Sequence, residues 1–303
     1  MMTGAVRIQS VLYRNDREEL RRSLRAIDQA AIQAGKKGWS VSLQWGDASE
    51  KPLFSDTEWQ EFRRAGRHLA SAEYSVFHSN TGYGKGNNLL SKNGHEDFLL
   101  IMNPEILLPP NVVIDLLSPF CDPEVGLTEA RQIPVEHPKV YDKITLETEW
   151  SSGACFMISR KLFEELQGFD TRTFFMYCED VDLSWRIRLI GKKLYYQPLA
   201  GVYHSRRLSE RGRNLASKTE MTYTVLSEAL LAYKWSYPEY ARERIRLAAE
   251  RGDPGSQEAL TAFRKLEYEG RLPSFLDPEH RIAHIIQYPE SGGMLFTRHQ
   301  YSL

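Results

Sequence analysis

Short apolar runs alternate with segments of helical periodicity through the first hundred residues. Residues 6–13 have the apolar composition of a buried strand. In the next segment, apolar residues recur at the spacing of one helix face, at Leu20, Leu24, Ile27 and Ala31. Strands that alternate with helices are typical of a doubly wound α/β domain, whose ligands gather at the carboxyl ends of its strands. The same periodicity predicts strands over 41–45, 74–78 and 97–102 and a helix over 57–70.

Local signals place the ends of two of these elements. Asn15 and Glu18 have the spacing of a capping box, which predicts the start of the first helix, and Gly35 and Gly38 are expected to end it. The run over 97–102 is of the kind buried on both faces of a parallel sheet, and Asn103-Pro104 halts it.

The character of the chain changes after residue 210. Helical periodicity covers 215–250 with a break at Pro238, and another helix is expected over 256–268. Between residues 204 and 251, ten Lys and Arg face six Glu, a local excess of +4. The sequence therefore predicts a first domain over 1–210 and a C-terminal helical appendage over 211–303.

Composition excludes several classes of protein. With 42% hydrophobic and 26% charged residues the chain is an ordinary globular protein, and a net charge of -1 offers no general attraction to nucleic acid. Three widely spaced cysteines fit neither a zinc module nor a disulfide framework, which indicates a reducing compartment. We see no secretory signal and no run near the roughly 18 apolar residues of a membrane span. The expected location is the cytoplasm, with peripheral contact at the inner face of the membrane left open.

Polar residues follow three of the predicted strands. Asp47 ends the second strand, Asn80 follows the third, and Asn103 and Glu105 follow the fourth in the motif NPE. A nucleotide at such a crevice needs a carboxylate or amide for its base and ribose, a loop of close approach, and a carboxylate near the diphosphate to hold a cation. These residues follow the strands in the order that a nucleotide site requires. Each one taken alone is also a residue that commonly forms a turn.

Three glycines stand within five positions in NTGYGKGNN, residues 80–88. A dinucleotide fingerprint has the spacing G-x-G-x-x-G, opens the first strand and helix unit, and has an acidic residue about 20 positions on. Here the spacing is G-x-G-x-G and the stretch follows a third strand. The pattern therefore favours a close-packed loop under another phosphate-bearing ligand, or a flexible turn, over a dinucleotide site.

Three carboxylates, Glu179, Asp180 and Asp182, follow an aromatic cluster within four positions. Crowding beside apolar surface can raise the pKa of one carboxyl enough for general base catalysis, whereas acids at a helix start also fit the helix dipole. Because Asp182 shares helical spacing with Trp185, we expect it to be mainly structural and take Asp180 as the candidate base.

His204 ends an apolar, strand-like segment and precedes four arginines within eight residues. Its position favours a role at a metal or a diphosphate, although a lone histidine is more often structural. The arginines themselves also fit a solvated surface loop.

In their order, these motifs resemble the family-two inverting glycosyltransferases with the GT-A fold, especially the bacterial rhamnosyltransferase-like branch. The family's Asn-x-Gly-(Phe/Tyr)-x-x-Gly-Asn-Asn stretch is matched over 80–88, and its Asn-Pro-Asp by 103–105. Its Gly-Ala, Gly-Phe-Asp, Glu-Asp-x-Asp and Pro-x-Ala-x-x-x-His motifs follow between 153 and 204. The resemblance covers roughly residues 5 to 210.

The resemblance implies a Rossmann-like mixed sheet flanked by helices, and roles for individual residues. Asp180 with Glu179 would form the catalytic pair, and Glu105 with His204 would bind the metal. The chain departs from the family at Glu105, where Asp is usual, and at the neutral Asn103, so metal dependence is less firmly expected than the fold. The implied nucleotide-sugar site comprises Asp47 at the base, Asn80, Gly82, Gly86, Asn88, Asn103, Arg206 and Arg207.

The implied reaction is transfer of a sugar, with inversion, to a hydroxyl of a polysaccharide or lipid-linked glycan. L-rhamnose from dTDP-rhamnose is the expected donor group, a UDP-sugar is the alternative, and Mg²⁺ or Mn²⁺ is the expected cofactor. A non-catalytic nucleotide-sugar or glycan-binding module would suit Asn103 and Glu105, but not the intact Glu179-Asp180 pair. A nucleotidyltransferase would need a glycine-rich and lysine signature that we do not find near the N-terminus.

Overall fold

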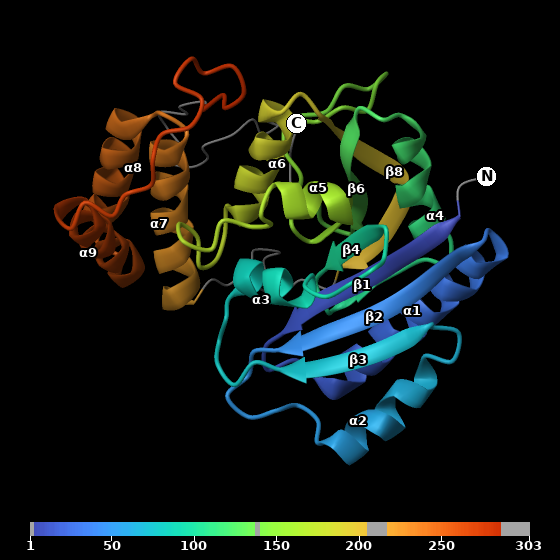
Figure 1. The fold of residues 1–303 in the computed structure, drawn as a ribbon. Coiled ribbons are helices and arrows are strands. Elements are labelled where there is room, and N and C mark those ends of the chain that lie inside the picture. Colours follow the sequence, from blue (N-terminus) through green and yellow to red (C-terminus); the bar gives the residue numbers. More distant parts are fainter. Residues whose placement is uncertain (1–2, 137–139, 205–216, 286–303) are drawn as a thin grey trace.

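One mixed sheet of eight strands forms the centre of the molecule, with the order β3-β2-β1-β4-β7-β6-β8-β5 (Figure 1). The computed structural model describes residues 3–136, 140–204 and 217–285. β1 pairs with β2 and β4 in parallel, whereas β7 is antiparallel to both of its neighbours. The strands are β1 Gly4–Leu12, β2 Trp39–Asp47, β3 Ser71–Val76, β4 Phe98–Met102, β5 Ile106–Leu107, β6 Val125–Ile133, β7 Cys155–Ser159 and β8 Lys193–His204.

Helices cover both faces of this sheet, as the α/β prediction requires (Figure 1). They are α1 Arg17–Lys36, α2 Asp56–Phe62, α3 Tyr83–Leu90, α4 Val112–Leu117, α5 Arg160–Glu165, α6 Glu179–Leu189, α7 Lys218–Lys234, α8 Pro238–Glu250 and α9 Pro254–Tyr268, with short 3₁₀ helices over Arg63–Ala65 and Ser118–Cys121.

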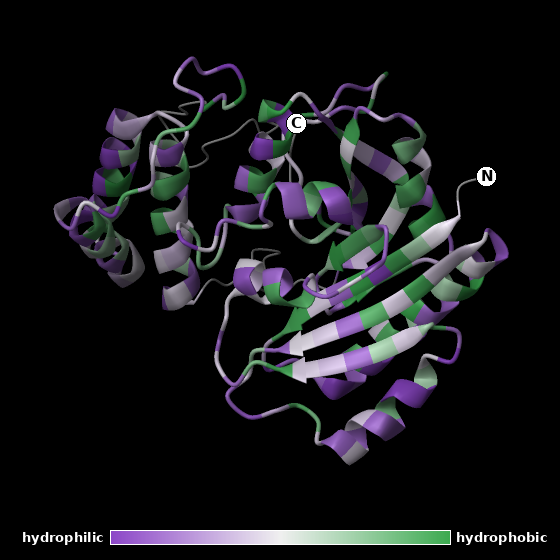
Figure 2. Ribbon diagram, in the orientation of Figure 1, coloured by the Kyte–Doolittle hydropathy of each residue, from purple (hydrophilic) through white to green (hydrophobic). Residues whose placement is uncertain are grey.

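β4 shows how the sheet divides the core. Leu100 and Met102 pack on the side of α1 and α4, whereas Leu99 and Ile101 pack on the side of α5 and α6. Figure 2 shows this strand as hydrophobic along its length. Burial on both faces was expected from the unbroken apolar run, and it places the residues that follow β4 at the carboxyl edge of the sheet.

Two predicted element ends are wrong. The first helix is capped by Asp16, whose side chain accepts hydrogen bonds of 2.9 Å from the backbone N–H groups of Glu18 and Glu19. Asn15 instead accepts a hydrogen bond from the N–H of Tyr13, so the expected capping box does not form. The predicted helix over 57–70 ends at Phe62 and passes into a 3₁₀ turn, because residues 71–76 pair with β2.

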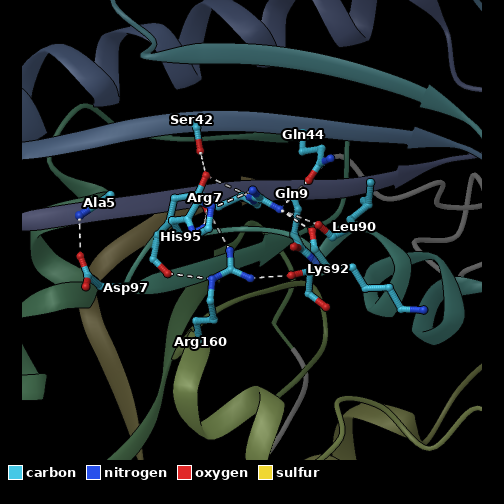
Figure 3. Close-up of polar contacts among 12 residues, drawn as sticks. Ala5, Arg7, Gln9, Ser42, Gln44, Leu90, Lys92, His95, Asp97 and Arg160 are labelled. Atoms are coloured by element: carbon cyan, nitrogen blue, oxygen red, sulfur yellow. Dashed lines mark hydrogen bonds and ion pairs between the residues drawn. The ribbon is translucent and has the colours of Figure 1, made fainter.

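A buried ionic cluster ties the sheet to α5 and to the segment before β4 (Figure 3). Glu96 lies 3.0 Å from Arg7 and 2.9 Å from Arg160, and it accepts a 2.7 Å hydrogen bond from Ser42. Burial raises the pKa of Glu96, but the bonds from Ser42 and Arg7 outweigh it and hold the pKa at about 2. Arg7 also donates to the carbonyl of Leu90, so the cluster fixes the end of α3.

The C-terminal helices share a hydrophobic cluster with α6. The rings of Trp185 on α6 and Trp235 after α7 lie 5.2 Å apart, close to perpendicular, and both are buried. The predicted domain boundary at residue 210 lies outside the described residues. The shared cluster nevertheless joins the predicted appendage to the helix that carries Glu179 and Asp180.

Candidate active site

The glycine stretch is the start of a helix and not the loop that we expected. Gly82 precedes α3 with a φ of 70°, and a Cβ at this position would lie 2.2 Å from the carbonyl oxygen of Phe175. At Gly86 a Cβ would lie 2.5 Å from the side chain of Val11 on β1. Only glycine fits these two positions. The protein itself fills the tight space around both glycines, and their contact with a ligand stays a prediction.

The two asparagines of this stretch hold neighbouring backbone. Asn80 accepts a 3.0 Å hydrogen bond from the N–H of Gly82. Asn88 donates to the carbonyl of Phe169 at 2.8 Å and accepts from its N–H at 2.9 Å, so it joins α3 to the Gly-Phe-Asp turn. Both side-chain amides therefore stabilise neighbouring backbone. Their binding of a donor sugar nucleotide stays a prediction.

Asn103, Glu105 and His204 lie together at the carboxyl edge of the sheet. β5 pairs with the end of β8, which brings Nε2 of His204 to 3.0 Å from Oε1 of Glu105 and 3.4 Å from the amide of Asn103. Nδ1 of His204 lies 2.9 Å from Oε1 of Gln132. Gln132 donates in turn to Ser152 at 3.0 Å, which fixes the direction of its amide.

The surroundings of His204 suit a bound cation. Its two ring nitrogens face an amide oxygen of Gln132 and a carboxylate oxygen of Glu105. Nε2 also faces the amide nitrogen of Asn103, so Asn103 and Glu105 both border it. A tautomer that donates Nδ1–H to Gln132 would direct the lone pair of Nε2 toward these two residues, which is the usual second-shell arrangement around a metal ligand.

The protein alone offers an incomplete set of metal ligands. Within residues 3–136, 140–204 and 217–285, no group of three or more His, Cys, Asp or Glu side chains could hold an ion. Glu105 and His204 would leave several positions of Mg²⁺ or Mn²⁺ for diphosphate oxygens and water. The donor set thus fits a cation that binds together with a nucleotide.

Asp180 lies at the first turn of α6 and is partly exposed. Its Oδ2 accepts a 2.6 Å hydrogen bond from the N–H of Gly153, and its Oδ1 accepts a 2.8 Å bond from the N–H of Val181. These bonds fix the orientation of the carboxylate. We did not expect the contact with Gly153, and the Gly-Ala motif was the available signal.

The backbone that leads into α6 is strained. Tyr177 and Cys178 have φ values of 70° and 64°, in the left-handed region that side chains with a Cβ rarely adopt. Such conformations cost of order 1–3 kcal/mol each and gather at functional sites. Here they turn the chain so that Glu179 points into the protein and is only 6% exposed.

Glu179 and Asp180 occupy different environments. Oε2 of Glu179 is buried and has no hydrogen-bond partner in the described parts of the chain. Burial, followed by the charge of Asp180, raises the pKa of Glu179 to about 8. At neutral pH Glu179 is therefore mostly protonated, a division of roles that is typical of paired catalytic carboxyls.

A Glu179→Gln variant is expected to show a flatter dependence of stability on pH. The native carboxyl has a pKa of about 8, against 4.5 ordinarily. The folded protein therefore binds this proton more tightly than the unfolded chain does. The resulting contribution to the free energy of unfolding is full below the unfolded pKa of 4.5 and is lost as the pH rises to the folded pKa of about 8. The free energy of unfolding should fall by up to about 1.4 kcal/mol per pH unit in this window. Gln does not ionise, so the variant should lack this loss.

Urea unfolding of both proteins at several pH values between about 5 and 8 measures this difference. Glu61→Gln, an exposed position on α2, is the control and should leave the slope unchanged. Equal slopes in wild type and Glu179→Gln would contradict the burial of an ionisable Glu179.

The structure assigns Asp182 a structural place. It is fully buried, and its carboxylate contacts Arg186 at 2.8 Å, Lys234 at 2.6 Å and the indole N–H of Trp235 at 3.1 Å. Lys234 also pairs with Asp170 of the Gly-Phe-Asp motif at 2.8 Å. No local sequence pattern had indicated Lys234, because its partners lie more than fifty positions away.

Asp47 is fully buried at the end of β2. Its oxygens accept hydrogen bonds from the hydroxyl of Tyr74 and from the backbone N–H groups of Ser49 at 2.9 Å and Leu53 at 2.7 Å. This is the turn-forming role weighed against base binding, and contact with a nucleotide base stays a prediction. Arg206 and Arg207 lie outside the described residues.

Tyr83 connects the two groups of acidic residues. Its hydroxyl donates to the carbonyl of Gly153 at 2.5 Å. Burial first, and then the charges of Asp180, Glu179 and, more weakly, Glu105, raise the pKa of Tyr83 well above its ordinary value. Gly153 contacts both Tyr83 and Asp180, and the carbonyl of the next residue, Ala154, accepts the N–H of Asn103 at 2.8 Å, so Asp180 and the segment that carries Glu105 border one region.

A cavity of about 400 Å³ lies away from this region. Its lining includes residues 140–142, residues 147–149 and the first residues of β8. It is thus at the opposite end of β8 from His204, and its lining contains no predicted site residue.

Comparison with known proteins supports the resemblance found in the sequence. No model of a known protein family matches the chain. A segment of 82 residues is 38% identical to N-acetylglucosaminyl-diphospho-decaprenol L-rhamnosyltransferase of Mycobacterium tuberculosis and covers 26% of each chain. A segment of 175 residues is 25% identical to rhamnosyltransferase WbbL of Escherichia coli and covers 46% of this chain and 66% of that protein. The matched segments thus span between about a quarter and two thirds of these relatives.

Solved structures show the fold over most of the chain. GalNAc-T7 with UDP, GalNAc and Mn²⁺ matches with a TM-score of 0.62 and 16% identity, covering 93% of this chain and 57% of that one. Mannosyltransferase PcManGT from Pyrobaculum calidifontis, in complex with GDP-Man and Mn²⁺, matches with a TM-score of 0.56 and 15% identity, covering 89% and 82%. The chain has the GT-A fold and is rhamnosyltransferase-like in sequence.

The helices say little about membrane contact. No helix within the described part of the chain combines the length and the apolar character that a membrane crossing needs.

Proposed function

We propose that this protein is an inverting glycosyltransferase that uses a nucleoside-diphosphate sugar. The observation that carries the proposal is the backbone link between two groups of side chains. Asp180 accepts the N–H of Gly153, and the carbonyl of the next residue, Ala154, accepts the N–H of Asn103 at 2.8 Å, beside Glu105 and His204. This arrangement sets a candidate base beside a candidate cation site, at the carboxyl edge of a GT-A sheet. Transfer of a sugar from a diphosphate requires both.

A divalent cation held by Glu105 and His204 would neutralise the charge that develops on the departing diphosphate. Gln132 would keep the ring of His204 oriented by accepting from Nδ1–H. Mn²⁺ in the GalNAc-T7 and PcManGT structures supports a cation here. Glu105 is longer than the aspartate of the resembled family, and its side chain is 25% exposed.

Asp180 would act as the general base. Its two bonds to backbone N–H groups hold the carboxylate, which would take the proton of an acceptor hydroxyl. The acceptor oxygen forms its bond to the anomeric carbon from the face opposite the diphosphate. The bond to the diphosphate breaks and its electron pair leaves with the phosphate oxygen, so the anomeric centre inverts.

We infer dTDP-rhamnose as the first donor to test and a UDP-sugar as the second. Two relatives are named rhamnosyltransferases, which supports rhamnose. The mycobacterial relative is named for a diphospho-decaprenol acceptor, which supports a lipid-linked glycan as the acceptor here. Such an acceptor would place the enzyme in the cytoplasm at the inner face of the membrane.

A thermal-shift panel of dTDP, UDP, dTDP-rhamnose and UDP-sugars, with and without Mn²⁺, tests the proposal. Ligand at a hundredfold excess over Kd adds about 2.7 kcal/mol of stability, which raises Tm by several degrees. We expect dTDP with Mn²⁺ to give such a shift, and Glu105→Ala to lose the part that depends on Mn²⁺.

Glu61→Ala on α2 is the matched control and should keep the full shift. The proposal fails if no nucleotide in the panel raises Tm. A shift with Mn²⁺ that survives in Glu105→Ala would remove Glu105 from the metal site.

A non-catalytic nucleotide-sugar or glycan-binding module is the second candidate. It is favoured by the neutral Asn103 and by the lack, among the described residues, of a cluster of three metal-binding side chains. Release of free nucleoside diphosphate from a nucleotide sugar in the presence of acceptor distinguishes the two, because a binding module would release none.

A further inference from the structure

Three aromatic side chains that the proposed chemistry does not use lie near the start of α6. The rings of Phe175 and Tyr223 have centroids 4.9 Å apart at an interplanar angle of 39°. Phe175 and Tyr177 are each 37% exposed, and Tyr223 is half-buried. Rings of this size are usually covered in a folded core, so their partial exposure beside one another points to a binding surface.

The backbone holds these rings in fixed positions. The carbonyl oxygen of Phe175 packs against Gly82, where no side chain would fit. Ser227 on α7 donates a 2.7 Å hydrogen bond to the carbonyl of Met176. A surface held in this way loses little conformational entropy when a ligand binds.

The rings border the candidate active site. Tyr177 stands three positions before Asp180, and Phe175 contacts Gly82 at the start of the helix that carries Tyr83. Tyr223 comes from α7, so the C-terminal helices contribute to this border. An acceptor whose hydroxyl reaches Asp180 would extend over this surface.

The charges near the rings are acidic. Burial raises the pKa of Tyr177 to about 12, and the charge of Glu220 adds to the shift. Asp180 stands three positions further along the chain. A neutral pyranose suits such a surface, because its C–H groups can lie on aromatic faces while its hydroxyls donate to these carboxylates. An anionic lipid headgroup would be repelled by the carboxylates of Glu220 and Asp180.

We propose that Phe175, Tyr177 and Tyr223 form the acceptor subsite and take a neutral pyranose ring of the acceptor glycan. This proposal rests on the proposed glycosyl transfer, for which it supplies the acceptor side. It gives the C-terminal helices a direct part in substrate recognition through Tyr223.

Two measurements on the full chain test the acceptor subsite. Saturation-transfer NMR with methyl glycosides of glucose, galactose and N-acetylglucosamine reports pyranose binding without any donor. The Phe175→Ala and Tyr223→Ala double variant should lose at least about fivefold of this signal, and its acceptor KM should rise about tenfold with kcat little changed. Phe175→Tyr keeps the ring and should stay close to wild type.

The outcomes separate this inference from the proposed function. If no nucleotide raises Tm but the pyranose signal depends on the rings, the proposed function fails and the pyranose subsite stands. An unchanged signal and KM in the double variant, or no pyranose signal in wild type, overturns the subsite. Ring-dependent binding to phosphatidylglycerol vesicles in place of pyranosides would overturn it as well. Unchanged thermal shifts with dTDP and Mn²⁺ would show that the variants keep their fold and donor site.

Discussion

An Asp180→Asn enzyme is expected to transfer sugar about 10²–10⁴-fold more slowly than wild type, the range that general base catalysis supplies. The amide cannot accept a proton at neutral pH, whereas the surrounding backbone would still hold the side chain near Gly153. Nucleotide binding should persist, because the candidate cation ligands Glu105 and His204 are untouched. Initial rates of transfer, together with thermal shifts by dTDP, measure the two effects separately.

The change also removes one hydrogen-bond acceptor. Both oxygens of Asp180 accept a backbone N–H, so the amide group leaves one donor unpaired at a cost of about 1–3 kcal/mol. Asp253→Asn is a matched control, because Asp253 accepts the N–H of Ser256 at the start of α9. The control should retain full activity. Near-normal transfer by Asp180→Asn would exclude Asp180 as the base.

The Lys234→Met variant is expected to lose about 3–5 kcal/mol of unfolding free energy, as when one partner of a buried ion pair is removed. The Lys234 side chain is only 8% exposed and contacts both Asp182 and Asp170. Burial raises the pKa of Asp170, but the bond from Lys234 outweighs it and holds the pKa at about 2. Without Lys234, no cation among the described residues would pair with Asp170, and Asp182 would keep its ion pair with Arg186.

Chemical denaturation measures this loss, and Lys218→Met is its control on the same helix. Lys218 lies 2.9 Å from Glu258, but both side chains are more than half exposed. Exposed pairs contribute only about 0–1 kcal/mol. Equal losses in the two variants would show that the buried network adds nothing beyond an ordinary surface pair.

The fold could be predicted because its signals are local. The apolar run that became β4 and the helical periodicity of α1 depend only on neighbouring residues, and the carboxyl-edge rule then placed Asn103 and Glu105. The family resemblance implied that Glu105 and His204 share a metal site, and the structure places them 3.0 Å apart.

The remaining features depend on contacts between distant parts of the chain. Gly82 and Gly86 lie where α3 begins, and Phe175 and Val11 leave no space there for a side chain. Neither Phe175 nor Val11 is close to these glycines in the sequence. The burial of Glu179 follows from the left-handed backbone of Tyr177 and Cys178, a conformation that these residue types rarely adopt. The ion pair of Lys234 with Asp182 is known only from the structure, in which α7 packs against α6.

The ion pairs of Lys234 with Asp170 and Asp182 limit how the C-terminal helices of related proteins could be exchanged. An exchange of C-terminal helices between two such transferases, meant to alter acceptor choice through Tyr223, would also exchange the cation that neutralises Asp170 and Asp182. A chimera is therefore compatible only when its incoming helix supplies a lysine at this position. The proposed acceptor contact of Tyr223 and the ion pairs of Lys234 thus depend on the same helix, α7.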